Sequence, residues 1–177
     1  MKITTRKIVI SAMLIALDVV FTRLLAVNVL AVKLGLGFAA VAVCAMLYGP
    51  AWAAVTAAIG DLVGALLFPT GAYFPGFTAT AAITGVVFGL YLHGSRPDFK
   101  RCFLAAITNV LVVTVALNTL MIALIFVPFS RELLIARVSE AGLMLVLQTA
   151  VLSALSASDM LYGKIIEFGG ENKQKSS

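Results

Sequence analysis

The chain has 177 residues, of which 62% are hydrophobic and 12% are charged, and its mean hydropathy is +1.08. A soluble globular domain carries about 25% charged residues. This composition therefore excludes a soluble protein and indicates an integral membrane protein, with one membrane domain over residues 1–177.

Six apolar runs predict an all-α bundle of six transmembrane helices, because about 20 apolar residues cross the hydrocarbon core of a membrane. The expected helices cover about 8–28, 35–49, 51–68, 77–93, 102–128 and 139–166. The second run is short, so we expect it to lie beside a cavity or to be tilted against longer neighbours. The polar residues 169–177 are expected to form a disordered tail.

Small residues stand four apart in the first expected helix, at Ala12 and Ala16. Such a pair makes a flat strip that another helix can approach closely, which increases van der Waals contact. The pattern is common in membrane helices. From this signal alone, packing within the protein is favoured over contact with a partner.

Two acidic residues lie deep in expected helices, Asp18 in the first and Asp61 in the third. Ionisable groups at membrane depth are costly, so they are functional candidates by default. Helical spacing predicts that Asp18 faces the protein interior. For Asp61, a structural pairing is favoured over direct contact with a ligand.

Two basic residues follow, Arg23 near the outer end of the first helix and Lys33 in the connector after it. Long basic side chains readily extend toward lipid headgroups. The alternative is that one of them pairs with an anionic ligand. On an ideal helix Arg23 points close to the direction of Ala12 and Ala16, so a ligand role requires the helix to bend or tilt.

Residues 68–78 contain two prolines, two glycines and four aromatic residues between two apolar runs. Proline fixes φ and lacks an N–H, and glycine permits positive φ, so these residues interrupt the helix. Because the connector is apolar and aromatic, we expect it to form a lid over a ligand cavity. Its candidate contacts are Tyr73, Phe74 and Phe77.

Asn118 in the fifth expected helix and Gln148 in the sixth place amide groups at membrane depth. A bare polar group in hydrocarbon is costly, and hydrogen bonding between helices explains each amide singly. Together with the basic pair and the aromatic connector, they suit a flat, hydrogen-bonding, anionic ligand. The sequence has one histidine, His93, and no nucleophile triad, P-loop or metal-ligand spacing, so we expect neither an enzyme nor a metal or cofactor site.

Basic residues set the expected orientation, because cytoplasmic loops of membrane proteins are rich in lysine and arginine. With a cytoplasmic N-terminus, nine of the 13 basic residues fall on the inner side and four on the outer side. This imbalance predicts that both termini are cytoplasmic. The aromatic connector and the connectors at 28–35 and 129–138 are then extracellular, and the ligand cavity lies near that side.

Several stretches of sequence are similar to one known family. They are Phe21-Thr22-Arg23-Leu24-Leu25, Val32-Lys33-Leu34-Gly35-Leu36-Gly37-Phe38, Tyr48-Gly49-Pro50, residues 59–78, Leu117-Asn118-Thr119-Leu120 and Val146-Leu147-Gln148-Thr149. Through them the chain resembles the substrate-binding S components of energy-coupling factor (ECF) vitamin transporters, and most closely the folate-specific branch. The resemblance extends from residue 5 to about residue 165, and 59–78 is its most specific part.

The resemblance implies a bacterial plasma-membrane protein of six helices that binds one vitamin from outside. Such a protein docks on a transmembrane T protein and two ATP-binding-cassette ATPases, and ATP hydrolysis by these partners makes it topple and release its cargo inside. The family places an A-x-x-x-A pattern of the first helix against the T protein. Ala12 and Ala16 match that pattern, which moves their interpretation toward partner docking.

The resemblance also implies how folate would lie. Its rings would meet Tyr73, Phe74 and Phe77, and Asn118 and Gln148 would supply amide hydrogen bonds. The glutamate carboxylates would meet Arg23 together with Lys33 or Arg137. Lys33 stands where the family pattern has arginine, and a lysine lacks the bidentate fork.

Two other functions stay open at this point. The chain could be an S component for another vitamin, such as riboflavin or thiamine. It could also be a ligand-free membrane assembly subunit whose aromatic connector only caps the bundle.

Overall fold

A computed structural model describes residues 4–24, 27–29, 32–69, 73–125, 131–158, 162–165 and 167. The expected tail at 169–177 lies outside these ranges. The elements follow the chain in the order α1 (Thr5–Val19), the π-helix η1 (Val20–Leu24), β1 (Val27–Val29), β2 (Val32–Leu34), α2 (Gly37–Tyr48), α3 (Pro50–Leu67), α4 (Pro75–Leu92), α5 (Phe99–Asn109), the π-helix η2 (Val110–Asn118), α6 (Thr119–Ile125) and α7 (Arg131–Ala157).

The described chain is helical apart from one short hairpin, in which β1 and β2 pair antiparallel with Val27 opposite Leu34. Four helical stretches are long and apolar enough to cross a membrane: Pro50–Leu67, Pro75–Leu92, Phe99–Ile122 and Leu134–Ala157. The third of these runs through α5 and η2 into α6 without a break. The predicted helical class is therefore confirmed, whereas the number of six crossings stays a prediction.

Proline and glycine set the boundaries around α3 and α4. Pro50 and Pro75 each begin a helix, at a position where the missing N–H costs no intrahelical hydrogen bond. Gly49, between α2 and α3, has a φ of 81°, which favours glycine. The short connection between these helices thus follows from the Gly-Pro pair in the sequence.

Three helix boundaries differ from the prediction. The first helix ends at Leu24, after η1, and the hairpin follows where helix was expected up to residue 28. The last helix begins at Arg131 and not at 139, because residues 131–138 are good helix formers although some are too polar for the hydrocarbon core. It ends at Ala157 and not at 166, and there Arg96 donates to the carbonyls of Ser156 and Ala157, which lack partners within the helix.

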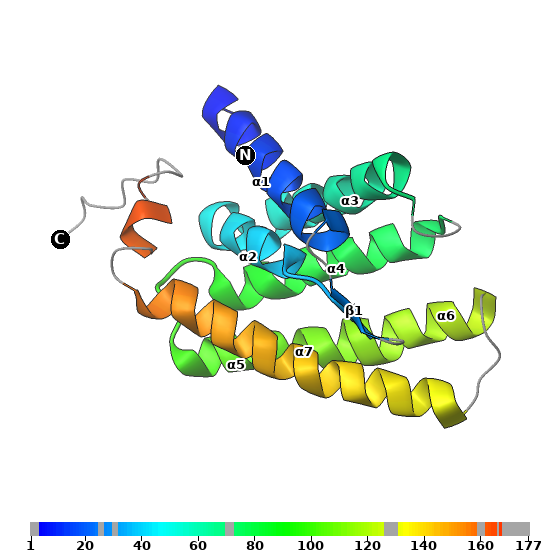
Figure 1. The fold of residues 1–177 in the computed structure, drawn as a ribbon. Coiled ribbons are helices and arrows are strands. Elements are labelled where there is room, and N and C mark those ends of the chain that lie inside the picture. Colours follow the sequence, from blue (N-terminus) through cyan, green and yellow to red (C-terminus); the bar gives the residue numbers. More distant parts are fainter. Residues whose placement is uncertain are drawn as a thin grey trace.

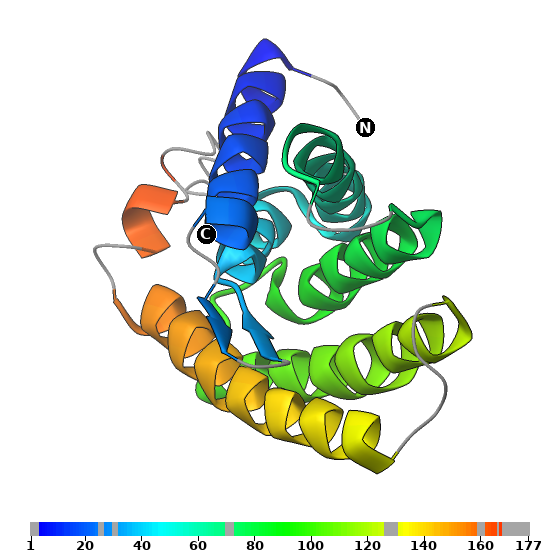
Figure 2. The same cartoon turned by 45° about the vertical axis from the view of Figure 1, so that its right-hand side comes forward.

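Close packing of α3 on α4 depends on small residues. A Cβ at Gly85 would lie 2.5 Å from the carbonyl oxygen of Ala53, and one at Gly89 would meet the backbone of Pro50. Figures 1 and 2 show α3 beside α4, and α7 beside the stretch from α5 to α6. These two groups of helices enclose the site described next.

The two ends of the described chain meet on one side of the molecule. Arg6 Nη2, in the first turn of α1, donates to the carbonyl oxygen of Glu167 at 2.9 Å. The described residues after α7 therefore come within reach of the first turn of α1.

Candidate functional site

A cavity of about 660 Å³ lies between α1–α4 and α5–α7. Seven of the predicted ligand residues line it: Arg23, Tyr73, Phe74, Phe77, Asn118, Arg137 and Gln148. The eighth, Lys33, lies in β2, where the backbone alone is described. The short helix α2 contributes Phe38 and Val41, so it does lie beside a cavity, as its length predicts.

Arg23 enters the cavity because the end of α1 is not an ideal α-helix. Arg23 lies in the π-helix η1. A π-helix has a wider turn than an α-helix, and this changes the direction of the side chains that follow. The Arg23 side chain is 11% exposed, whereas Ala12 and Ala16 are exposed on another face of α1. The conflict expected from ideal helical geometry is thus removed by the π-helix.

Asp61 pairs with Arg23 across the space between α3 and η1. Arg23 Nη2 lies 3.8 Å from Asp61 Oδ1. Thr78 Oγ1, in the first turn of α4, donates to Asp61 Oδ2 at 2.8 Å, and Tyr73 OH lies 2.9 Å from Thr78 Oγ1. The structural pairing favoured for Asp61 is therefore present, and Asp61 also lines the cavity.

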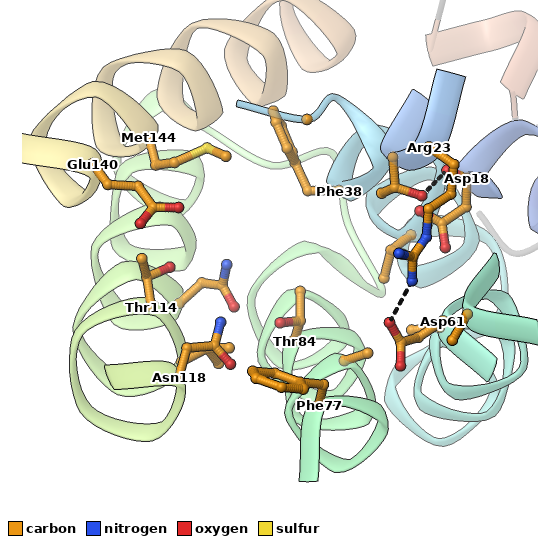
Figure 3. A pocket seen from close by; sticks show the side chains of 18 of the residues that line it. Asp18, Arg23, Phe38, Asp61, Phe77, Thr84, Thr114, Asn118, Glu140 and Met144 are labelled. Carbon is orange, nitrogen blue, oxygen red and sulfur yellow. Dashed lines mark hydrogen bonds and ion pairs between the residues drawn. The ribbon is translucent and has the colours of Figure 1, made fainter. Parts of the chain in front are cut away.

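Asp18 lies in the last turn of α1, just before η1, and is buried, as its helical position predicts. Its carboxylate fits between two glycines, because a Cβ at Gly37 of α2 or at Gly60 of α3 would collide with it. Thr22 donates to the backbone carbonyl of Asp18 at 2.6 Å. Figure 3 shows Asp18, Arg23 and Asp61 together on one side of the cavity.

The described part of the aromatic connector meets the cavity at the beginning of α4. Phe74 and Phe77 pack edge to face, with ring centroids 6.3 Å apart and an interplanar angle of 85°. Tyr73, Phe74 and Phe77 all line the cavity, as the sequence predicts. Residues 70–72, the middle of the expected lid, lie outside the described residues.

The opposite side of the cavity carries amides from two helices. Asn109 Nδ2, at the end of α5, donates to Gln148 Oε1 of α7 at 3.3 Å. Asn109 Oδ1 and Asn118 Oδ1 are buried and have no hydrogen-bond partner among the described residues. Asn118 ends η2, so a π-helix borders the cavity on this side too.

Arg137 and Glu140 form an ion pair on α7, with Arg137 Nη1 2.5 Å from Glu140 Oε2. Both line the cavity, and Figure 3 shows Glu140 across it from Asp61. Arg137 was expected in a connector, and the early start of α7 places it on the helix instead. Sequence reasoning missed Glu140 and Asn109, although an ionisable residue and an amide inside expected helices are signals of the same kind as Asp61 and Asn118.

The site combines features that suit a particular ligand chemistry. Its charged groups are Arg23, Arg137, Asp18, Asp61 and Glu140, and its apolar surface includes Phe38, Phe74 and Phe77. A ligand with flat rings, hydrogen-bond donors and acceptors, and carboxylates can match such a lining. Within the described residues, no group of three His, Cys, Asp or Glu side chains is placed to hold a metal ion.

The chain is similar to known proteins over most of its length. The family model described as "ECF transporter, substrate-specific component" matches residues 6–161. A folate transporter FolT from Clostridium novyi (strain NT) is 31% identical over 141 residues, which cover 80% of this chain and 82% of that protein. A folate transporter FolT from Leuconostoc mesenteroides is 35% identical over 127 residues, covering 71% of this chain and 68% of that protein.

A solved structure has the same fold. It is described as "Crystal structure of FolT bound with folic acid", and it superposes with a TM-score of 0.83 at 29% sequence identity. The match covers 92% of this chain and 98% of that one. The family model alone covers most of the chain. The chain therefore belongs to the ECF transporter family, as a substrate-specific component.

Proposed function

We propose that this chain is a folate-binding S component that captures folate outside the cell and delivers it inward while docked on an ATP-driven module. The observation that carries the proposal is the match over most of the chain to a FolT structure with folic acid bound, at a TM-score of 0.83. The cavity adds the required chemistry, since it offers aromatic rings, amides and arginines to one ligand.

Within this cavity the rings of folate would lie near Phe74 and Phe77. Asn118 and Gln148 would hydrogen-bond the polar edges of the ligand, because amides can both donate and accept. Arg23, with Lys33 or Arg137, would meet the glutamate carboxylates. Arginine suits this role, because its planar fork of N–H donors matches a carboxylate.

The chain is a multi-pass membrane protein, since its family is a transporter family and four described helices can cross a membrane. We propose six crossings, with both termini in the cytoplasm and the cavity near the extracellular side. The contact of Arg6 with Glu167 supports one part of this topology, because it brings the first turn of α1 and the last described residue to the same side.

The family works with a T protein and two ATPases, which carry ATP hydrolysis, so the chain itself is not an enzyme. We propose that the T protein docks on Ala12 and Ala16. Both are exposed on α1, among larger exposed residues such as Val9, Met13 and Leu17. Small residues within an apolar helical face let a second helix approach closely.

Calorimetric titration of folate into the detergent-purified chain, without its partners, tests the proposed function. We expect one folate per chain with a nanomolar dissociation constant. Riboflavin and thiamine are the matched comparison ligands, and tight binding of either one would replace folate. A folded chain that binds none of the three would instead support a ligand-free assembly subunit.

A further inference from the structure

A chain of hydrogen bonds and one ion pair joins the start of α4 to Arg23. Thr78 Oγ1 donates to Asp61 Oδ2 at 2.8 Å, and Tyr73 OH lies 2.9 Å from Thr78 Oγ1. A threonine hydroxyl has one proton. Because Thr78 gives that proton to Asp61, Tyr73 is the donor in its bond with Thr78. The chain therefore runs from phenol to hydroxyl to carboxylate to guanidinium.

The orientation of the Asp61 carboxylate determines which of its oxygens faces the Arg23 guanidinium. With Oδ2 held by Thr78, the other carboxylate oxygen, Oδ1, faces Arg23 Nη2 at 3.8 Å. This distance exceeds the ~2.7–2.9 Å of a close charge-assisted hydrogen bond. Asp61 thus attracts the guanidinium toward α3.

A glycine on α3 lets the Arg23 side chain pack closely against that helix. A Cβ at Gly64, one turn after Gly60 on α3, would lie 3.1 Å from Arg23 Nε. The arginine therefore packs directly on the backbone of α3, and its side chain is 11% exposed. Packing fixes the stem of this side chain, and Asp61 attracts its charged end.

We propose that Asp61, Thr78 and Tyr73 are positioning residues, which orient Arg23 toward a carboxylate of the ligand. They thereby set selectivity for ligands that carry carboxylates. This inference rests on the proposed folate-binding function. A guanidinium has five N–H donors, more than one carboxylate accepts, so Arg23 can meet a ligand carboxylate while Asp61 orients it.

The first test compares folate with its bisamide, in which both glutamate carboxylates are replaced by neutral amides. Thr78→Val keeps the volume of the side chain and removes its hydroxyl. By calorimetry we expect the dissociation constant of folate to rise about 5- to 10-fold, and that of the bisamide by less than about 2-fold. Thr78→Ser should restore folate binding, because it returns the hydroxyl.

The other two positioning residues should follow the same pattern with different sizes. Asp61→Asn removes the charge that attracts Arg23, so we expect a larger loss for folate than in Thr78→Val. Tyr73→Phe removes the first donor of the chain, which reaches Asp61 only through the hydroxyl of Thr78. We therefore expect the smallest loss of folate affinity, about 2-fold. An equal loss for folate and bisamide in Asp61→Asn would contradict the proposal.

Thr80→Val is the matched control on the same helix. The Thr80 hydroxyl donates to the carbonyl of Phe77 at 2.8 Å, and this residue is outside the cavity lining. The substitution is chemically the same as Thr78→Val, but it removes no contact with Asp61. We expect both dissociation constants to stay within about 2-fold of the wild-type values.

A double-mutant cycle separates positioning from general stability. In an Arg23→Gln background, Thr78→Val should have no further effect on folate, because the group it orients is gone. The proposal is overturned if Thr78→Val keeps its full effect without Arg23, if it weakens both ligands equally, or if it weakens neither. Failure of the proposed function is distinct, because the folded wild type would then not bind folate.

Discussion

Two walls of the cavity differ in how their polar groups are satisfied. The paired wall consists of Arg23 and Asp61, which contact each other, and Thr78 supports Asp61 from outside the cavity lining. The amide wall consists of Asn109, Asn118 and Gln148, and two of its carbonyl oxygens have no partner among the described residues. Figure 3 shows Arg23 and Asp61 on one side and Asn118 on the other.

This difference indicates two ways in which a ligand can gain affinity. On the amide wall, a ligand supplies a hydrogen bond that the buried oxygen lacks, and an unpartnered buried polar group costs about 1–3 kcal/mol. On the paired wall, a ligand carboxylate joins charges that are already compensated and aligned. The amide wall therefore contributes affinity, because the ligand satisfies its buried atoms. The paired wall contributes selectivity, because its charges are preorganised for a carboxylate.

The largest expected effect comes from a change that leaves both walls intact. Ala16→Trp places a large ring on the exposed face of α1, which we propose as the docking site of the T protein. We expect folate uptake by cells to fall to background, while folate binding by the purified chain is unchanged. Transport of labelled folate and calorimetry measure the two properties separately.

Val146→Trp is the matched control for this prediction. Val146 is 71% exposed on α7, so the introduced tryptophan ring would meet lipid and not the proposed docking face on α1. We expect normal uptake in this variant. If Ala16→Trp transports folate as well as Val146→Trp does, the T protein docks elsewhere.

The sequence predicts most of these residues but not their geometry. Arg23 and Asp61 are found as charges at membrane depth, a signal that needs only hydropathy. Their ion pair depends on the π-helix η1, in which hydrogen bonds join residues five apart. A helical wheel drawn for an ideal α-helix cannot anticipate this local change. The start of α7 is missed for a related reason, since hydropathy detects the hydrocarbon core and not a helix that extends beyond it.

On the paired wall, Arg23→Ala should have the second largest effect. It removes the guanidinium that we expect to meet the glutamate carboxylates, and losing one partner of a buried charged contact costs about 2–5 kcal/mol. We expect the dissociation constant of folate to rise at least about 30-fold, and that of the bisamide much less. Arg101→Ala is the matched control, because it removes the same charge from a residue that lies outside the cavity and contacts Ser95. Equal losses for both ligands would exclude a carboxylate role for Arg23.

On the amide wall, Asn118→Leu should weaken folate and its bisamide alike. The substitution keeps a similar volume and removes both the donor and the acceptor that face the cavity. We expect each dissociation constant to rise about 10-fold, which corresponds to about 1.4 kcal/mol. A loss confined to folate would show that Asn118 contacts the carboxylates, and the two walls would then share one function.

The smallest effect should come from an unpartnered hydroxyl that does not face the ligand. Thr149 Oγ1 on α7 is buried without a hydrogen-bond partner among the described residues, and Thr149 is outside the cavity lining. Thr149→Val replaces the hydroxyl with a methyl group of the same shape and so removes an unsatisfied polar atom. We expect the free energy of unfolding to rise by about 1 kcal/mol, and the melting temperature by about 2–4 °C, with unchanged folate binding. Weaker folate binding would mean that this hydroxyl reaches the ligand, so that the amide wall extends further along α7 than the cavity lining indicates.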